Sequence, residues 1–233
     1  MAMFVLVHGM WAGGWYWQKV RPLLRAAGHE VLMPTLTGLG ERVHLARPDV
    51  DLDTHIMDVV NVLRYEGLRE VVLVGHSYGG MVIRGVADHV PERLARLVYL
   101  DAFVPNDGDR VLDLWQPEYR LDFEAMAAEF DRWRIPTLDP AGEDPEIVAW
   151  EAGRTVPHPI ATFRQPIRLS NGEADAIPCA FIHCTEKPDG DAFARFATMA
   201  REDSRWQYLA LDAVHDAMAV KPEELTAILL SLV

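Results

Sequence analysis

Basic residues and cysteine are scarce in this chain, and it has no long apolar run. Lys and Arg number 22 against 35 Asp and Glu, which gives a formal net charge of −13. Nucleic acids and anionic membrane surfaces bind basic footprints, so we expect neither as a partner. No apolar run approaches the roughly 18 residues of a transmembrane helix. The first residues lack the positive flank and apolar length of a signal peptide, so we expect none.

The two cysteines, Cys179 and Cys184, stand five positions apart in an apolar stretch. In a strand, a rise of about 3.3 Å per residue would separate them by roughly 16 Å. A disulfide needs Cα atoms within about 7 Å of each other. We therefore expect two free thiols, which favour the cytoplasm as the compartment.

Short apolar runs alternate with helical patterns along most of the chain. The expected strands are near-continuous apolar runs, typical of parallel strands covered on both faces. They fall at 3–7, 30–33, 70–74, 96–100, 179–183 and 206–211. The expected helices lie between them, at 17–27, 53–66, 79–88, 191–202 and 222–232. This alternation predicts an α/β fold with a doubly wound, mainly parallel six-stranded sheet.

Residues 105–178 interrupt this alternation, because they contain no good strand and many prolines. Large apolar side chains recur there at helical spacing: Trp115, Tyr119, Phe123, Met126, Phe130, Trp133 and Trp150. One interpretation is an extra helical layer packed on the core. The other is a helical cap over the carboxyl ends of the strands, where open α/β sheets bind ligands. We adopt the second, with a core formed by 1–104 and 179–233 and a cap, or lid, at 105–178.

The sequence Gly-His-Ser-Tyr-Gly at 75–79 follows an apolar run and precedes a helical pattern. At a strand-to-helix turn, this pattern forms a nucleophile elbow, which exposes the serine hydroxyl on a strained corner. Side chains at the flanking positions would clash, hence Gly75 and Gly79. Because the chain has only four serines, the pattern favours Ser77 as a catalytic nucleophile over an ordinary turn.

A serine hydroxyl needs a neighbouring base to take its proton, and four histidines follow Ser77. His89 falls late in the next helix, His158 in the expected cap and His183 within a strand. His215 instead falls in a short loop after the last strand, at the carboxyl edge of the sheet. The chain order of such hydrolases is Ser, acid, His. We therefore predict His215 as the general base.

Two aspartates compete for the acid that completes the catalytic triad. Asp101 directly follows the strand expected at 96–100, and Asp189 lies in a loop with Pro and Gly after the next strand. Either carboxylate could orient the imidazole of His215 and stabilise its charged form. A carboxylate at the end of an apolar strand is costly without a partner, whereas solvated aspartates are common in such loops. We favour Asp101 and keep Asp189 as the alternative.

The Gly-rich segment 8–14 follows the first expected strand. Its glycines let the chain turn back toward the elbow. The backbone N–H groups of Met10 and Tyr78 would then form an oxyanion hole, which stabilises the charge of a tetrahedral intermediate. No phosphate-binding lysine follows these glycines, and the glycines at 38 and 40 are too few for a dinucleotide fingerprint. For the substrate pocket we expect Trp11, Trp115 and Phe103.

Three segments carry a family resemblance: Phe-Val-Leu-Val-His-Gly at 4–9, Val-Leu-Val-Gly-His-Ser-Tyr-Gly-Gly-Met at 72–81 and Cys-Thr-Glu at 184–186. In them the chain resembles the plant methyl-esterase and hydroxynitrile-lyase branch of the α/β-hydrolases, and in particular its small bacterial esterase relatives. The resemblance covers both ends of the chain and fades through the cap. It implies an esterase without cofactor or metal, with a compact helical lid and a substrate with a hydrophobic acyl part.

Two departures from that branch are informative. The plant enzymes carry their catalytic Asp directly after Cys-Thr-Glu, where this chain has Lys187. This strengthens Asp101, at a second acid position used elsewhere in the superfamily. The lyases carry Lys directly after the catalytic His and Thr in place of the first-strand Gly. This chain has Asp216 and Gly9, so cyanohydrin cleavage is disfavoured.

These features predict a serine esterase that cleaves small hydrophobic esters through an acyl-enzyme. Amide or carbamate hydrolysis, another reaction of the same superfamily, and non-catalytic binding of a small ligand are the alternatives. The only expected partner is the small-molecule ester. The oligomeric state stays open, with a homodimer as one option.

Overall fold

The computed structural model describes residues 1–115, 122–138, 145–187 and 190–233. Its main sheet has six strands: β1 (Met3–Val7), β2 (Glu30–Leu32), β3 (Val71–His76), β4 (Leu94–Leu100), β7 (Cys179–Cys184) and β8 (Trp206–Leu211). Their order is β2-β1-β3-β4-β7-β8, and every neighbouring pair is parallel. The predicted α/β fold is confirmed. The bounds of β1 and β8 are as predicted, and those of the other strands differ by one or two residues at an end.

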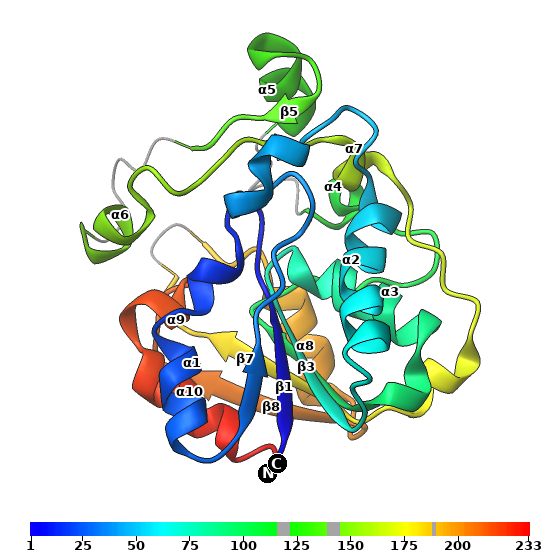
Figure 1. Ribbon diagram of the computed structural model, residues 1–233, viewed down its shortest axis with the longest axis vertical. Coiled ribbons are helices and arrows are strands. Elements are labelled where there is room, and N and C mark those ends of the chain that lie inside the picture. The colour runs from blue at the N-terminus through cyan, green and yellow to red at the C-terminus, as the bar shows by residue number, and fades with distance from the viewer. Residues whose placement is uncertain (116–121, 139–144, 188–189) are drawn as a thin grey trace.

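Helices cover both faces of the sheet, which explains the near-continuous apolar runs of its strands. Side chains alternate along a strand, so Val5 and Val7 of β1 belong to one core cluster and Phe4 and Leu6 to the other. The first face packs on α2 (Leu52–Tyr65), α3 (Gly79–His89) and α8 (Ala194–Glu202). The second packs on α1 (Val20–Ala26) and α10 (Pro222–Leu230), as Figure 1 shows.

Two expected helices start later than the sequence pattern indicates. The helix expected at 17–27 is divided into the 3₁₀ helix η1 (Gly14–Trp17) and α1, which has Pro22 in its first turn, where proline is tolerated. The helix expected at 191–202 begins only at Ala194, because the carboxylate of Asp191 accepts the backbone N–H of Phe193 and holds these residues in a turn. Three short helices were not expected: η2 (Gly40–Leu45), η3 (Pro91–Arg93) and α9 (Ala217–Val220).

The segment between β4 and β7, the cap segment (105–178), contains short helices. They are α4 (Val111–Leu114), α5 (Phe123–Phe130), α6 (Pro145–Glu151), α7 (Ala161–Arg164) and the 3₁₀ helix η5 (Gly172–Ala176). The expectation that it contains no strand was wrong, because β5 (Arg134–Ile135) pairs antiparallel with β6 (His158–Pro159). Strands of two residues are too short to produce a visible alternation of side chains.

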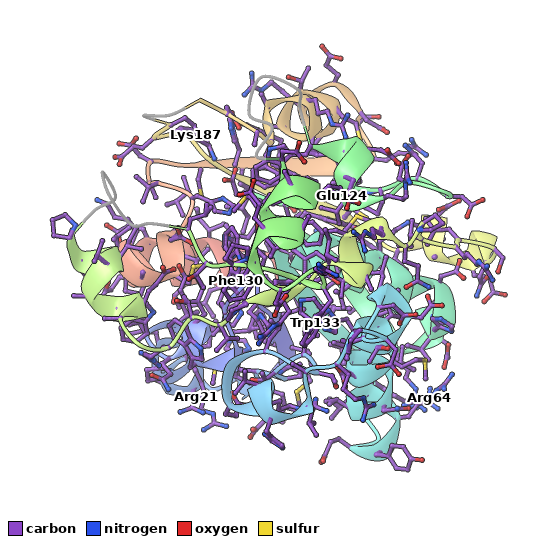
Figure 2. All side chains as sticks on the ribbon, turned by 90° about the horizontal axis from the view of Figure 1, so that it is seen from above. Arg21, Arg64, Glu124, Phe130, Trp133 and Lys187 are labelled. Atoms are coloured by element: carbon purple, nitrogen blue, oxygen red, sulfur yellow. The ribbon has the colours of Figure 1, made fainter. Side chains whose placement is uncertain are left out.

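The part of the cap segment that contains α5, β5 and α6 lies beyond the carboxyl ends of the strands, whereas Ser170 and Asn171 near its end bond to Asp88 of α3. Figure 1 shows α5 and β5 at the top of the molecule, above the end of β1, with α6 to one side. The view from above in Figure 2 places Phe130 and Trp133 of this segment over the body of the molecule. Both cysteines are free, as expected. Of the helices that the structure describes, none has the length and apolar character to cross a membrane.

Candidate active site

Ser77 occupies the sharp turn between β3 and α3. Its φ is +54°, in the left-handed region, and its side chain is nearly buried. A Cβ atom on Gly75 would lie 2.6 Å from the carbonyl oxygen of Gly79, and one on Gly79 would lie 2.9 Å from that of His8. Neither position has room for a side chain, which is the reason given above for both glycines. A strained residue at the end of a central strand is a common feature of functional sites.

His215 and Asp101 form a hydrogen-bonded pair at the same edge of the sheet. The Nδ1 of His215 lies 2.6 Å from the Oδ2 of Asp101. A carboxylate can only accept, so Nδ1 carries the proton and Nε2 is left as a basic nitrogen. Asp101 is fully buried and His215 is one-third exposed at its side chain. The acid of the sequence analysis is therefore in contact with the base, whereas the alternative, Asp189, lies outside the described residues.

The backbone and charge environment of Asp101 is unusual. Its φ is +42°, and its N–H donates to the carbonyl oxygen of Ile182 on β7 at 2.8 Å. Burial by itself would raise the pKa of Asp101. The hydrogen bond and charge of His215 and the charge of Lys187 outweigh burial, so the pKa is held below its usual value. The carboxyl group is therefore ionised at neutral pH and can stabilise an imidazolium ion.

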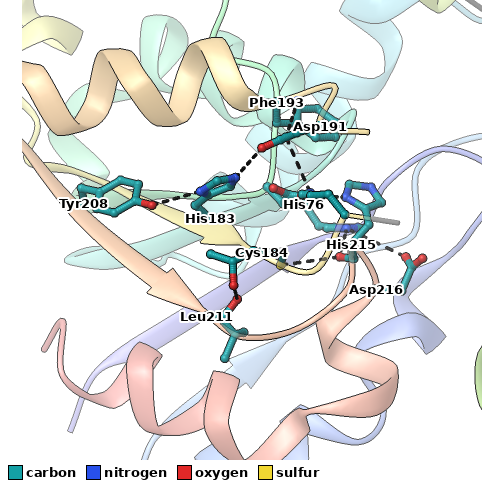
Figure 3. A network of polar contacts seen from close by, with 12 residues as sticks. His76, His183, Cys184, Asp191, Phe193, Tyr208, Leu211, His215 and Asp216 are labelled. Carbon is teal, nitrogen blue, oxygen red and sulfur yellow. Dashed lines mark hydrogen bonds and ion pairs between the residues drawn. The ribbon is translucent and has the colours of Figure 1, made fainter. Parts of the chain in front are cut away.

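Two rings hold the imidazole of His215 in place. Phe193 stacks on it with ring centroids 5.1 Å apart and an angle of 6° between the planes. His76, buried beneath it, has its Nε2 3.1 Å from the backbone oxygen of His215. Burial, followed by the charge of His215, lowers the pKa of His76 well below its usual value. His76 is thus neutral, and its Nε2–H donates to the loop that carries His215, as Figure 3 shows.

Ser77 and His215 open onto a common cavity of about 480 Å³, a volume within the usual range of roughly 300–1,000 Å³ for small-molecule sites. Its wall combines catalytic and aromatic groups: Gly9, Met10, Trp11, Tyr16, His76, Ser77, Trp115, Thr137, Leu138, Val148, Glu151, Ala152, Gly153, Thr155, His215 and Asp216. Within the described residues the hydroxyl of Ser77 makes no hydrogen bond to His215. Such bonds are often long in unliganded sites and tighten when substrate binds.

Of the three expected pocket residues, Trp11 and Trp115 line the cavity and Phe103 does not. Phe103 is 1% exposed and packs behind Trp115, with ring centroids 5.9 Å apart. Phe103 lies three residues after the end of β4 (Leu94–Leu100), a strand that the sequence predicted at 96–100. Trp115 of the cap segment packs against Phe103. The sequence does not show how the cap segment packs on the core, so it could not show that Phe103 lies behind the cavity wall.

The loop expected to form the oxyanion hole is held by the cap segment. Trp11 has a φ of +60°, its Nε1 donates to the carbonyl oxygen of Ile135 at 3.3 Å, and its own carbonyl accepts the N–H of Val156 at 3.0 Å. Its backbone N–H also points at Nδ1 of the buried His158, 3.4 Å away. These contacts fix the chain next to Met10, which lies on the cavity wall.

Tyr78, the other residue of the expected oxyanion hole, directs its side chain away from the cavity. The side chain is fully buried, and its hydroxyl lies 2.9 Å from Nδ1 of His55. The Nε2 of His55 in turn lies 2.9 Å from the carbonyl oxygen of Thr37, so Nε2 carries the proton and the Tyr78 hydroxyl donates to Nδ1. The side chain of Tyr78 thus anchors the elbow to α2, and it is not on the cavity wall.

An acidic corner of the cavity was not expected from the sequence. The hydroxyl of Tyr16 donates to Glu151 at 2.6 Å, and Asp216 stands on the same wall. Burial, then the charges of Asp216 and Glu151, raise the pKa of Tyr16 well above its usual value, so it stays protonated as a donor. The only sequence signal was the position of Asp216 next to His215, whereas Tyr16 and Glu151 carried none.

Among the residues that the structure describes, two side-chain groups have the spacing of metal ligands, but both are otherwise engaged. The first is His76, His215 and Asp216, and the second is Asp101, His183 and Asp191. In the first, the Nε2 of His76 carries the proton that it donates to a carbonyl. In the second, the ammonium group of Lys187 is paired with both carboxylates. A cation there would compete with a charge that the chain itself supplies, so neither group leads us to propose a metal.

Comparison with known proteins places this chain in a family. The carbendazim hydrolyzing esterase of Nocardioides sp. (strain SG-4G) is 40% identical over 243 aligned positions, which span 100% of both chains. Methylesterase 1 of Arabidopsis thaliana is 33% identical over 152 positions, covering 60% of this chain and 52% of the plant protein. The solved extracellular α/β-hydrolase of a Paenibacillus species shares the fold, with a TM-score of 0.85 at 24% identity over 99% of this chain and 98% of the other.

These relatives confirm the branch that the sequence resembles, with plant methylesterases and a bacterial esterase among its members. The sequence model described as the Alpha/beta hydrolase family matches residues 4–228. The match extends from β1 into α10 and includes the elbow, the cap segment and the loop of His215. The chain belongs to the α/β hydrolase family.

Proposed function

We propose that this protein is a serine esterase that hydrolyses small hydrophobic carboxylic esters through an acyl-enzyme. The observation that carries the proposal is the Asp101–His215 hydrogen bond at a cavity that Ser77 also lines. The esterase relatives support ester hydrolysis.

In the first half of the reaction, the hydroxyl oxygen of Ser77 attacks the carbonyl carbon of the ester while Nε2 of His215 takes its proton. The electron pair of the carbonyl bond moves to the oxygen, and the N–H groups of Met10 and Tyr78 stabilise the resulting oxyanion. The intermediate collapses, the bond to the alcohol oxygen breaks, and this oxygen takes the proton from His215. An alcohol leaves and the acyl group stays on Ser77.

In the second half, water replaces the alcohol and the same groups act again. Nε2 of His215 takes a proton from water as its oxygen attacks the acyl carbon. The second intermediate collapses, and the bond between the acyl carbon and the oxygen of Ser77 breaks. Nε2 of His215 returns the proton to this oxygen, and the carboxylic acid leaves. Asp101 stays ionised throughout, holds the imidazole in the correct tautomer and stabilises its charged form. The protein needs no cofactor for these steps.

The cavity supports the substrate class. Trp11 and Trp115 offer flat apolar surfaces beside the predicted nucleophile, and a volume of about 480 Å³ suits a small aromatic or aliphatic ester. We propose that the cap segment acts as the lid over this cavity, since Trp115, Thr137 and Val148 on the wall all come from it. The free thiols support the cytoplasm as its compartment.

A carbamate is the second substrate class to test. The relative aligned over the full chain is named for carbendazim, a carbamate, and this supports testing the compound here. The attack on a carbamate carbonyl uses the same groups. A lyase reaction is disfavoured, because Asp216 stands where the lyases carry Lys.

The experiment is a p-nitrophenyl ester panel with acyl chains of two to eight carbons, run beside amides, carbendazim and cyanohydrins. We expect ester turnover that the Ser77→Ala substitution reduces by at least about 10⁴-fold. The Ser204→Ala variant, which removes a serine outside the cavity, is the matched control. A fluorophosphonate probe should label native protein at Ser77, and labelling should disappear in Ser77→Ala.

Ester cleavage that survives in Ser77→Ala would contradict the proposal. A native protein that neither turns over any ester nor reacts with the probe, yet binds such esters, would instead indicate a small-ligand receptor on the same fold.

A further inference from the structure

Lys187 is one of three lysines in the chain, and it is built into the site. Its ammonium group bonds to Oδ2 of Asp101, the same oxygen that accepts the hydrogen bond of His215. It also lies 3.9 Å from Oδ1 of Asp191. The side chain is 14% exposed, far less than is usual for a lysine. Figure 2 shows Lys187 on the opposite side of the molecule from Arg21 and Arg64.

The surroundings of Lys187 leave it little freedom. Its nitrogen lies 5.7 Å from the ring centre of Phe193, the residue that stacks on His215. Within the described residues the other oxygen of Asp101, Oδ1, is buried and has no hydrogen-bond partner. Oδ2 therefore carries both side-chain contacts of this carboxylate. Among the described side chains, only the imidazole of His215 would then bond to Asp101 if Lys187 were removed.

We propose that Lys187 is a positioning residue that shares the triad carboxylate with His215, fixes its orientation and lowers the pH at which the imidazole is free to act as a base. The inference rests on the proposed esterase function and deepens it. The resemblance to the plant methyl-esterases implies that Lys187, directly after Cys-Thr-Glu, stands at the position of their catalytic aspartate, so a cation would replace an anion there.

The physical reason is competition for one negative charge. A carboxylate that faces only an imidazole stabilises the imidazolium form fully. A second cation on the same oxygen offsets part of that stabilisation and repels the imidazolium directly. The proton then leaves the imidazole more easily, and a larger fraction of the enzyme carries a basic Nε2 at mildly acidic pH.

The other charged and titratable groups near His215 are few. Asp216 adjoins it in the chain, and neutral His76 lies beneath it with ring centroids 4.4 Å apart. The Sγ of Cys184 lies 3.9 Å from the backbone oxygen of His215, and burial raises the pKa of this thiol well above its usual value, so it is neutral. Asp191 lies 3.9 Å from the ammonium group of Lys187. Asp216 and Asp191 are negative and favour the imidazolium. Of the described groups around His215, Lys187 alone carries a positive charge that opposes the imidazolium form.

The test replaces the cation and follows the pH dependence of kcat/KM on a p-nitrophenyl ester. In Lys187→Met we expect the acidic limb of the profile to move upward by about one pH unit. Lys187→Gln, which keeps a hydrogen-bond donor without the charge, should show a shift in the same direction and decides the question if the Met variant does not fold. Lys187→Arg should restore most of the original position.

The matched control is Lys221→Met, which changes the net charge equally. In the native protein the ammonium group of Lys221 is exposed and lies 3.9 Å from Glu224. The pH profile of kcat/KM should therefore not move in this variant. A limb that stays in place in both neutral variants, or that moves downward, overturns the proposal even if stability falls, because a purely structural lysine would change stability alone.

A measurement without turnover separates this inference from the proposed function. The ring-carbon NMR resonance of His215 should titrate at a higher pH in Lys187→Met than in the native protein. This shift tests the lysine even if no ester is cleaved, and its absence would overturn the inference even if the esterase is active.

Discussion

Two hydrogen-bonded histidine–aspartate pairs in the described part of the chain are built from the same groups and differ in access. His215 lies 2.6 Å from Asp101, and His183 lies 2.7 Å from Asp191. The second nitrogen of His183 is also engaged, 3.0 Å from the hydroxyl of Tyr208, as Figure 3 shows. The second nitrogen of His215 belongs to a ring on the cavity wall. The comparison teaches that such a pair can serve as a base only where one nitrogen is left for the substrate.

The largest expected effect is a difference in kcat/KM between variants of the two carboxylates, Asp101 and Asp191. Asp101→Asn would allow the imidazole of His215 to adopt the wrong tautomer and would leave its charged form unstabilised. We expect kcat/KM on a p-nitrophenyl ester to fall by about 10³–10⁴-fold. Asp191→Asn, the matched control, removes the corresponding carboxylate of the other pair and should cost less than about tenfold, because His183 does not line the cavity.

Thermal denaturation of both variants shows whether lost activity reflects lost folding. Equal losses in the two variants would break the comparison. Asp189→Asn completes the series, since that residue was the alternative acid. If turnover vanished with Asp189 replaced and survived with Asp101 replaced, our assignment of the acid would be wrong.

The sequence predicted the parts of this site that depend on regular structure. The apolar runs gave all six strands, because parallel strands covered on both faces leave an unbroken apolar signature. The two glycines around Ser77 identified the elbow, because only a very tight turn excludes a Cβ atom on both sides. The positions of Asp101 and His215 after strands then followed from the rule that carboxyl ends of parallel strands meet at one edge.

The parts that the sequence did not predict depend on contacts between irregular segments. The pairing of Arg134–Ile135 with His158–Pro159 is too short to leave a pattern. Tyr16 and Glu151 meet across 135 positions of the chain, and Phe103 is separated from the cavity by Trp115. Lys187 was noticed only as a departure from a family motif, and its contact with Asp101 needed the three-dimensional structure.

Two buried histidines that have no hydrogen bond to a carboxylate, His55 and His8, affect the pH dependence of stability. Burial, as the largest cause, lowers the pKa of His55 to about 4 and that of His8 to about 3, from an ordinary value of 6.5. Between pH 6.5 and pH 4 the unfolded chain therefore binds a proton at His55 that the folded chain does not. Stability is lost as the pH falls through this window, by up to about 3 kcal/mol from His55 alone.

Urea denaturation at pH 7, 5.5 and 4.5 measures this loss. Replacing His55 by Gln should make the free energy of unfolding less dependent on pH in that window. The variant should be less stable at pH 7, because a flexible amide does not hold the bonds to Tyr78 and Thr37 in the geometry of the imidazole. His44→Gln, at an exposed histidine, should keep the native pH dependence. An unchanged slope in His55→Gln would show that His55 takes up its proton equally in both states.

The smallest expected effect is a change in KM at the cavity, whose wall includes His215 and not His183. Trp115 lines it and packs on Phe103 and Phe123, with ring centroids 5.9 and 5.3 Å away. Trp115→Ala should raise KM for an aromatic ester by about tenfold, since one aromatic face contributes roughly 1–2 kcal/mol of binding. KM for p-nitrophenyl acetate should change little.

Trp133→Ala is the control within the cap segment. The ring of Trp133 stacks on the guanidinium of Arg134 at 4.6 Å and is not on the cavity wall. If both variants lowered activity equally on large and small esters, the aromatic wall would be supporting the fold and not selecting the substrate. Trp115 would then have no part in binding substrate beside His215.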